Sequence, residues 1–314
     1  MIQTERQNLL WSIVLAGGEG ERIRPLVQRW LGRHKPKQYC AFTGRRSMLA
    51  HTLDRAGRLS PPERQVTVIA RSHRQDASLQ FGQRPQGTVI EQPSNRDTAA
   101  GIFLPLTFVR ARDAHATVVV YPSDHFIYPE ERFVEVVQSA ISAADRFDDR
   151  LVLLGVLPDG LELEYGWIKP GEQLGSAGGR CVRKVEGFCE KPDYDRARAA
   201  KASGALWNTL VFATRVEVLW EMGWRYVPEV MPHFEALCDA IDTPAQQRVL
   251  EYIYERMPKR NFSSDLLARA AAEVAVIEMD DVVWSDWGKP ERIVNTLSQM
   301  GKEPAFPLEC AAAS

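Results

Sequence analysis

The sequence predicts an α/β fold, in which helices cover both faces of a doubly wound, mostly parallel but mixed sheet. Through the first half of the chain, short apolar runs of strand length alternate with segments whose apolar residues have helical spacing. A glycine-rich loop follows the first of these runs, where such sheets bind ligands. The chain has 314 residues, which is enough to bury a core of this kind.

The elements of the first half follow from composition and periodicity. Apolar and β-branched runs bounded by turn residues predict strands, and apolar residues at three- and four-residue steps predict helices. Strands are expected at 13–16, 66–70, 88–91, 118–121 and 151–156, and helices at 47–59, 98–112 and 130–147. Their alternation favours a parallel sheet, whose ligand site lies beyond the carboxyl ends of the strands.

The pattern changes from about Leu161 onward. The glycine-rich stretch 175–179 predicts a loop, and Asp280 with Asp281 predicts the turn of a hairpin between strands at 274–279 and 282–284. Further strands are expected at 181–188 and 206–213, and helices at 194–203, 230–241 and 246–257. The tail at 301–314 has prolines and a small-residue end, so it is expected to fray.

Charge and composition exclude several classes of protein. Lysine and arginine number 39 against 41 aspartates and glutamates, and this balance offers no basic surface for nucleic acid. The five cysteines form no Cys-x-x-Cys pair, which is typical of reduced thiols in a cytoplasmic protein. Residues 1–10 have no apolar core like that of a signal peptide, and the apolar run at 151–157 is too short to span a bilayer. We therefore expect a cytoplasmic protein without a nucleic acid or membrane partner.

The glycine-rich loop is the most informative motif. Residues 15–26 read LAGGEGERIRPL. Glycine backbone lets a phosphate approach closely, and Arg22 and Lys37 supply positive charge to the same oxygens. Ile23 stands where a dinucleotide-binding fingerprint needs its third glycine, and the loop has no P-loop ending. An ordinary strand-to-helix turn is the alternative interpretation.

Two aspartates each follow an apolar strand directly. Asp124 lies in YPSDH at 121–125, and Asp286 lies in WSDWG at 284–288. A carboxylate at the carboxyl end of a strand is placed to bind Mg²⁺, which relies on one or two carboxylates together with substrate phosphates. Alone, Asp124 is better explained as the N-cap of the following helix. The pair favours a metal site, with His125 in a structural role.

The motifs together resemble those of the sugar-1-phosphate nucleotidyltransferases, in particular the mannose-1-phosphate guanylyltransferase branch. They are the loop at 15–26 with PKQ at 36–38, EQPSNRDTAA at 91–100, PSDH at 122–125, EYGW at 164–167, FCEKP at 188–192, WNTL at 207–210 and WSDWG at 284–288. The resemblance spans roughly residues 13–296. Departures are Glu21 for the family's threonine, Leu210 for its glycine, and a longer segment at 27–35.

This resemblance implies a fold of the nucleotide-diphospho-sugar transferase type with a sugar-binding subregion. Residues 1–300 would form a single domain, with its nucleotide-binding half at about 11–155 and its sugar-binding half at 156–300. The implied catalytic residues are Arg22 and Lys37, and the implied Mg²⁺ ligands are Asp124 and Asp286. Nucleotide binding would fall to Leu15, Ala16, Gly17, Gly18, Gly20, Asn95, Asp97 and Thr98, and sugar-phosphate binding to Tyr165, Gly166, Glu190, Lys191 and Asn208.

Asp97 has two interpretations. Its carboxylate would accept from N1–H and N2–H₂ of guanine together, whereas adenine presents an acceptor at N1. An unpaired buried polar group costs about 1–3 kcal/mol, so this arrangement predicts a preference for GTP over ATP. Equally, Asp97 would serve as the N-cap of the helix expected from Thr98.

The expected reaction transfers a nucleotidyl group from GTP to a hexose 1-phosphate, above all mannose 1-phosphate, with Mg²⁺ as cofactor. The products would be GDP-sugar and pyrophosphate, the substrates are small molecules, and a homodimer is compatible with this interpretation. One rival is the same chemistry with another nucleoside triphosphate or hexose phosphate. The other is a catalytically weak regulatory relative that binds nucleotide-sugar, which Glu21 and the segment 27–35 motivate.

Overall fold

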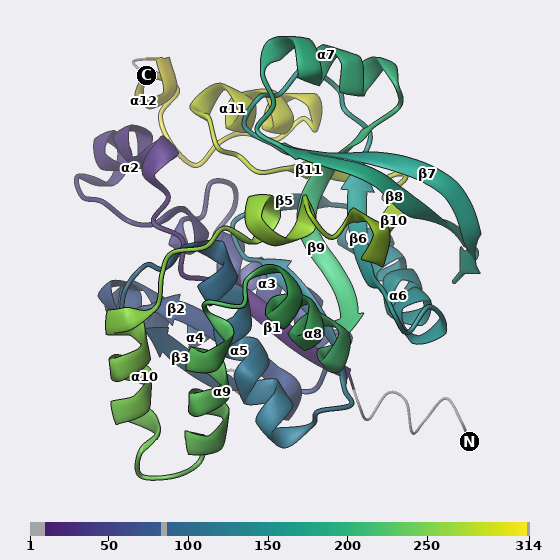
Figure 1. Ribbon diagram of the computed structural model, residues 1–314. Coiled ribbons are helices and arrows are strands. Elements are labelled where there is room, and N and C mark those ends of the chain that lie inside the picture. Colours follow the sequence, from purple (N-terminus) through teal and green to yellow (C-terminus); the bar gives the residue numbers. More distant parts are fainter. Residues whose placement is uncertain (1–9, 83–86, 313–314) are drawn as a thin grey trace.

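The structure is a computed structural model that describes residues 10–82 and 87–312 (Figure 1). Residues 1–9, on which the expected lack of a signal peptide rests, lie outside the described residues. No helix in the part of the chain that is described is both long and apolar enough to cross a bilayer.

Strands from both halves of the chain form one central sheet. They are β1 (Leu10–Ala16), β2 (Gln65–Ala70), β3 (Thr88–Gln92), β4 (Thr117–Pro122), β6 (Leu151–Val156), β7 (Gly166–Ala177), β8 (Arg180–Glu190), β9 (Leu206–Arg215) and β10 (Val274–Glu278). Within the described residues their order is β3-β2-β1-β4-β9-β6-β10-β8-β7. β3, β2, β1 and β4 are parallel, as are β6 and β10, whereas β9, β8 and β7 run antiparallel to their neighbours. The predicted α/β class with a mixed sheet is confirmed.

Helices cover both faces of this sheet. On one face lie α5 (Asp97–Arg112), α8 (Val216–Tyr226), α9 (Met231–Ala240) and α10 (Gln246–Arg256), and on the other α3 (Met48–Gly57), α4 (Arg74–Phe81) and α6 (Glu130–Arg146). Side chains of β1 alternate between the faces: Trp11 and Ile13 pack with the first set, and Val14 and Ala16 with the second. The remaining helices are α2 (Arg24–Leu31), α7 (Tyr194–Ala202), α11 (Pro290–Gln299) and α12 (Glu309–Ala312). Figure 1 shows α2, α11 and α12 together at one end of the molecule.

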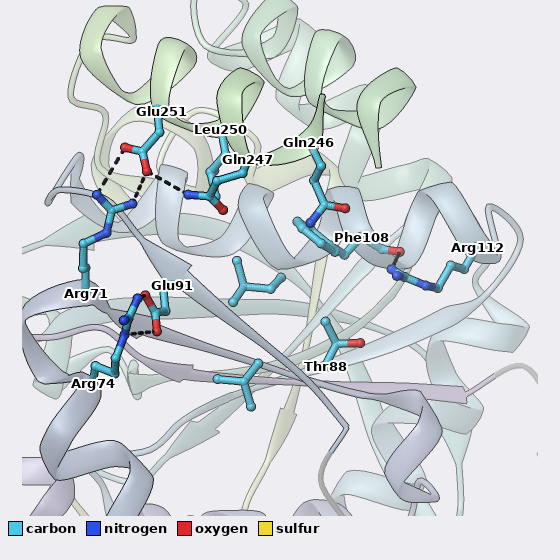
Figure 2. A pocket seen from close by; sticks show the side chains of 12 residues that line it. Arg71, Arg74, Thr88, Glu91, Phe108, Arg112, Gln246, Gln247, Leu250 and Glu251 are labelled. Carbon is cyan, nitrogen blue, oxygen red and sulfur yellow. Dashed lines mark hydrogen bonds and ion pairs between the residues drawn. The ribbon is translucent and has the colours of Figure 1, made fainter. Parts of the chain in front are cut away.

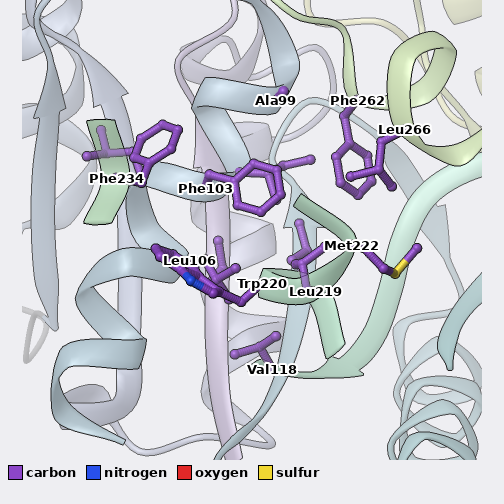
Figure 3. Close-up of a cluster of buried hydrophobic side chains, with 14 of the residues drawn as sticks. Ala99, Phe103, Leu106, Val118, Leu219, Trp220, Met222, Phe234, Phe262 and Leu266 are labelled. Carbon is purple, nitrogen blue, oxygen red and sulfur yellow. The ribbon is translucent and has the colours of Figure 1, made fainter. Parts of the chain in front are cut away.

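Aromatic side chains from several helices meet in the hydrophobic core between the sheet and helices α5, α8, α9 and α10. The ring of Phe103 on α5 lies 5.9 Å from that of Phe234 on α9 and 6.5 Å from that of Trp220 on α8, between centroids (Figure 3). Phe262 begins a π-helical turn, and its ring lies 6.5 Å from Phe103. Such aromatic pairs stabilise a fold beyond the free energy gained by burying their surface. The contact between Phe262 and Phe103 therefore anchors the π-helical turn to α5.

Two local predictions for the second half are wrong. The strands around Asp280 and Asp281 form no hairpin: β10 pairs with β6, and β11 (Val283–Ser285) pairs with β5 (Phe126–Tyr128) in a separate two-stranded sheet. An apolar strand such as β10 buries more area inside the central sheet than in a surface hairpin. In the stretch 175–179 only Gly178 and Gly179 form a turn, because the preceding residues extend β7. The other predicted strands and helices are confirmed, with ends that shift by about three residues or fewer.

The structure describes the C-terminal tail as far as Ala312, and Phe306 and Ala311 in it pack in a hydrophobic cluster. Fraying of this tail stays a prediction. Phe306 is 3% exposed, and its ring lies 5.7 Å from Trp30 and 6.2 Å from Phe42. Phe42 in turn lies 5.7 Å from Trp287. The buried ring of Phe306 and the hydrogen bond from the Ala305 amide to the Phe42 carbonyl hold this segment against the domain, and the prolines and small residues of the tail did not indicate these contacts.

Phe306→Ala should lower the free energy of unfolding by about 3–5 kcal/mol, because it removes a buried ring from this cluster. Leu308 is 58% exposed, so Leu308→Ala is a matched control that should change the same quantity by less than about 0.5 kcal/mol. Urea denaturation followed by tryptophan fluorescence measures both variants. Small and equal effects would show that the tail frays in solution.

Candidate active site

A cavity of about 370 Å³ opens beyond the carboxyl ends of β1 and β4. The register that pairs Leu15 with Pro122 brings the glycine-rich loop beside the segment of Asp124. The wall contains predicted residues from widely separated motifs, namely Leu15, Gly18, Arg22, Thr98, Asp124, Tyr165, Gly166, Glu190, Lys191, Asn208 and Asp286. The predicted residues outside the described wall are Ala16, Gly17, Gly20, Lys37, Asn95 and Asp97. The fold thus gathers most of the predicted site in one place.

A larger cavity of about 650 Å³ lies between β3 and α10 (Figure 2). Its arginines already have acidic partners: Arg71 pairs with Glu251, and Arg74 with Glu91 (Figure 2). It shares no lining residue with the cavity at the glycine-rich loop. Because the smaller cavity is lined by most of the predicted site residues and the larger cavity by none of them, we take the smaller cavity as the candidate active site.

Side chains that follow Lys37 hold the backbone of the glycine-rich loop. Gln38 Nε2 donates to the carbonyl oxygens of Ala16 (2.9 Å) and Gly18 (2.8 Å). The Tyr39 hydroxyl donates to the same Ala16 oxygen at 3.0 Å. These buried bonds shape the loop within the protein itself, so its backbone is organised before a ligand arrives.

The carboxylate of Asp286 is buried and hydrogen-bonded through both oxygens. Its Oδ1 accepts from the Tyr165 hydroxyl (2.5 Å), the Gly288 amide (3.0 Å) and Arg292 Nη1. Its Oδ2 accepts from Arg22 Nη2 at 2.8 Å. Burial alone would raise the pKa of Asp286, but the nearby cations and the tyrosine hydroxyl outweigh it and hold the pKa below its usual range. Asp286 is therefore ionised at neutral pH.

Lys37 lies between the two aspartates. Its Nζ is 2.8 Å from Asp124 Oδ2 and also donates to the main-chain carbonyl of Asp286. Lys37 is 3% exposed, and its ammonium group contacts Asp124, which lines the cavity. Gly20 allows the close approach of this segment, because a Cβ at Gly20 would lie 2.9 Å from the main-chain nitrogen of Lys37. Gly20 also has φ of +64°, which favours glycine. Burial opposes ionisation of Asp124, but the charge of Lys37 holds its pKa below the usual range.

His125 is neutral and engaged by its neighbours. Its Nδ1 accepts from Trp284 Nε1 at 3.3 Å, which leaves the proton on Nε2, 3.7 Å from Asp124 Oδ1. Burial lowers the pKa of His125 to about 4. These contacts agree with a structural role and leave no histidine base at the aspartates.

The two aspartates fit a Mg²⁺ ion whose other ligands come from substrate and water. Carboxylate oxygens are the protein ligands that Mg²⁺ prefers, and Asp124, 38% exposed, shares the cavity wall with Asp286. Among residues 10–82 and 87–312, no cluster of three or more histidine, cysteine or acidic side chains is placed to hold a metal ion by itself. A site with two carboxylates therefore depends on substrate phosphates to complete it.

The same cavity is lined by the residues expected to bind sugar phosphate. A Cβ on Gly166 would lie 2.7 Å from Glu190 Oε2, so glycine is what allows this close approach. Burial raises the pKa of Glu190, against the opposing charge of Lys191. Asn208 Oδ1 accepts from the Leu210 amide at 3.0 Å, and Leu210 has φ of +55°, where the family pattern has glycine. Leu210 thus adopts a left-handed backbone conformation that is uncommon for leucine and is readily adopted by glycine.

Asp97 is engaged within its own turn. Its Oδ1 accepts from the Thr98 amide (2.6 Å) and from Asn261 Nδ2 (3.1 Å), while its own amide donates to Asn95 Oδ1 (2.8 Å). α5 begins at Asp97, and the N-cap position is Arg96, one residue before the predicted one. Both lone pairs of Oδ1 are thus occupied, so only Oδ2 would accept from a base. Recognition of guanine by Asp97 stays a prediction, and it would have to use Oδ2.

Several supporting residues were not predicted. Arg292 contacts Asp286 and Tyr165, Glu162 contacts Arg292, and Asn261 contacts Asp97. Arg292 and Glu162 belong to none of the motifs, although each lies a few residues from one. Their closeness in sequence to a motif was the only indication that Arg292 and Glu162 would lie at the site.

Comparison with known proteins agrees with this geometry. The Nucleotidyl transferase family profile matches residues 11–303. The mannose-1-phosphate guanylyltransferase of Escherichia coli (strain K12) is 30% identical over 90% of this chain and 58% of its own length, and the xanthan biosynthesis protein XanB of Xanthomonas campestris pv. campestris (strain B100) is 30% identical over 92% and 60%. This chain thus spans about three fifths of the length of these curated relatives. The crystal structure titled mannose-1-phosphate geranyltransferase, from Thermus thermophilus, superposes with a TM-score of 0.78 at 27% identity, covering 91% of this chain and 79% of that one. The chain belongs to the nucleotidyl transferase family.

Proposed function

We propose that the chain transfers a guanylyl group from GTP to a hexose 1-phosphate, with mannose 1-phosphate as the preferred acceptor and Mg²⁺ as the cofactor. GDP-sugar and pyrophosphate would be the products. The observation that carries the proposal is the meeting of Asp124, Lys37 and Asp286 beside a cavity that Glu190 and Lys191 also line. Relatives that align with 90% of this chain are mannose-1-phosphate guanylyltransferases, which supports guanine and mannose.

The chemistry needs charge neutralisation more than proton transfer. An oxygen of the sugar phosphate attacks the α-phosphorus of GTP, and a new P–O bond forms as the bond from that phosphorus to the bridging oxygen breaks. Pyrophosphate leaves with the bonding electrons. A phosphate oxygen is nucleophilic without a base, so positioning and electrostatic stabilisation would supply the rate enhancement. A site rich in cations whose histidine is neutral suits this reaction.

Each charged residue has a distinct proposed role. Arg22 and the glycine backbone would bind the β- and γ-phosphates, and Lys191 would bind the phosphate of the sugar. Lys37 would neutralise the charge on the α-phosphoryl group during transfer. Asp124 and Asp286 would hold Mg²⁺, which supplies positive charge at the phosphates when bound. Arg22 now pairs with Asp286, and its side chain is 47% exposed, so it is free to turn toward phosphates.

Glu21 and the segment 27–35, which motivate the alternative of a regulatory nucleotide-sugar-binding protein, lie outside the described wall of the cavity. Glu21 pairs with Arg24 at 2.9 Å on an exposed surface. The segment 27–35 contains the end of α2, whose apolar side chains pack in the cluster of Phe306. Neither feature disturbs the described lining of the cavity, which favours the enzyme over the binding protein.

A pyrophosphate-release assay tests the proposal across GTP, ATP, UTP and dTTP, each with mannose 1-phosphate and with glucose 1-phosphate. We expect release with GTP and mannose 1-phosphate to exceed the other pairs by about tenfold or more, since one mismatched polar contact costs that much. Excess EDTA should abolish release. Binding of GDP-mannose without release from any pair would contradict the proposal and favour the regulatory relative.

Lys37→Ala should lower kcat by more than about tenfold while the affinity for GTP changes far less, because the proposed contact matters most in the transition state. Lys35→Ala is the matched control, since Lys35 lies two residues away and, among the described contacts, pairs with neither Asp124 nor Asp286, and it should leave kcat unchanged. Steady-state kinetics and GTP titration measure both variants, and thermal melting separates loss of the fold from loss of turnover. A decrease in kcat smaller than about tenfold would remove Lys37 from the proposed role.

A further inference from the structure

Arg292, near the start of α11, connects three groups around the candidate site. One nitrogen, Nη1, donates to both Asp286 Oδ1 and the Tyr165 hydroxyl, and the other, Nη2, donates to Glu162 Oε2. The guanidinium carbon lies 4.8 Å from the centroid of the Tyr165 ring. The planar guanidinium group of arginine can contact two carboxylates and an aromatic ring at once, and the ammonium group of a lysine cannot make the same set of contacts.

Glu162 is itself held in place, so it gives Arg292 a fixed anchor. The Glu162 side chain is largely buried, and its Oε1 accepts from the Glu164 amide at 3.0 Å and lies 3.5 Å from Lys289 Nζ. Its carbonyl oxygen accepts from Trp167 Nε1 at 2.9 Å. Contacts from both backbone and side chains thus fix the carboxylate that orients Arg292.

The two oxygens of Asp286 differ as a result. Oδ1 is occupied by the Tyr165 hydroxyl, the Gly288 amide and Arg292 Nη1, all from the interior of the protein. Oδ2 contacts Arg22, whose side chain is about half exposed. When Arg22 turns to a phosphate, Oδ2 is the oxygen that becomes available, and Arg292 keeps the carboxylate from rotating.

We propose that Arg292, held by Glu162, is a positioning residue that anchors Oδ1 of Asp286 so that Oδ2 faces the divalent cation. This inference rests on the proposed function, because it assumes that Asp286 is a metal ligand. Groups that orient a metal ligand typically change metal affinity by about 10- to 100-fold when they are removed, without touching the metal. A merely structural ion pair would change stability and leave metal affinity unaltered.

Binding of Mn²⁺ to the full chain, measured by the loss of free-ion signal in electron paramagnetic resonance with GDP-mannose present, tests the inference without an activity readout. Arg292→Gln should raise the dissociation constant for Mn²⁺ by about tenfold or more. Arg292→Lys keeps the charge and so compensates both carboxylates, which protects the fold. It should still raise the constant by about threefold to tenfold, because one ammonium cannot make all the contacts of the fork.

Glu291→Gln is the control, since Glu291 is an exposed neighbour on the same helix, and it should leave the Mn²⁺ constant unchanged. Thermal melting confirms that each variant is folded, and Arg292→Lys decides the outcome if Arg292→Gln is not. Mn²⁺ affinity within about twofold of wild type in the folded Arg292 variants would overturn the inference and leave the proposed function standing. Failure of the wild-type chain to bind Mn²⁺ would instead overturn the metal site in the proposed function, and this inference with it.

Discussion

The carboxylate of Asp286 lies, mostly buried, where the glycine-rich loop, the start of β7 and the start of α11 meet, and its charge must be compensated by groups from all three. Arg22 approaches from the loop, the Tyr165 hydroxyl from the residue before β7, and Arg292 from α11. Removal of one partner from a buried charge costs several kcal/mol, so these segments are energetically tied to one another. The same arrangement brings Asp124 close, since Lys37 contacts both aspartates.

Packing outside the cavity holds the segments of Asp124 and Asp286 together. Parallel pairing of β1 with β4 sets the loop beside Asp124, and the hydrophobic cluster around Phe306 also contains Trp287. Phe126 stacks on Trp287 with ring centroids 4.4 Å apart, which joins the segments that follow the two aspartates. The C-terminal tail therefore helps to hold the candidate site, although none of its residues lines the described cavity.

Local signals and the order of the motifs predicted much of this from sequence. The strands of the parallel part were recognisable because each is a short apolar run, and the motifs gathered at one cavity because the carboxyl ends of such strands share an edge. The pairing of β10 with β6 was not predictable in this way, since Val274 and Leu151 are far apart in sequence while Asp280 and Asp281 form a convincing local turn. The roles of Arg292 and Glu162 were not predicted for the same reason, because these two residues are far apart in sequence and no periodicity or short motif relates them.

Divalent-cation sharing by Asp124 and Asp286 is the claim on which the proposed chemistry most depends. A crystal structure of the full chain with GDP-mannose and Mn²⁺, with the metal located by its anomalous scattering, tests it most directly. The account predicts an anomalous peak bonded to both carboxylates, with Arg22 turned away from Asp286 and toward phosphate. A peak bonded to phosphate oxygens alone, with Arg22 still paired to Asp286, would contradict it.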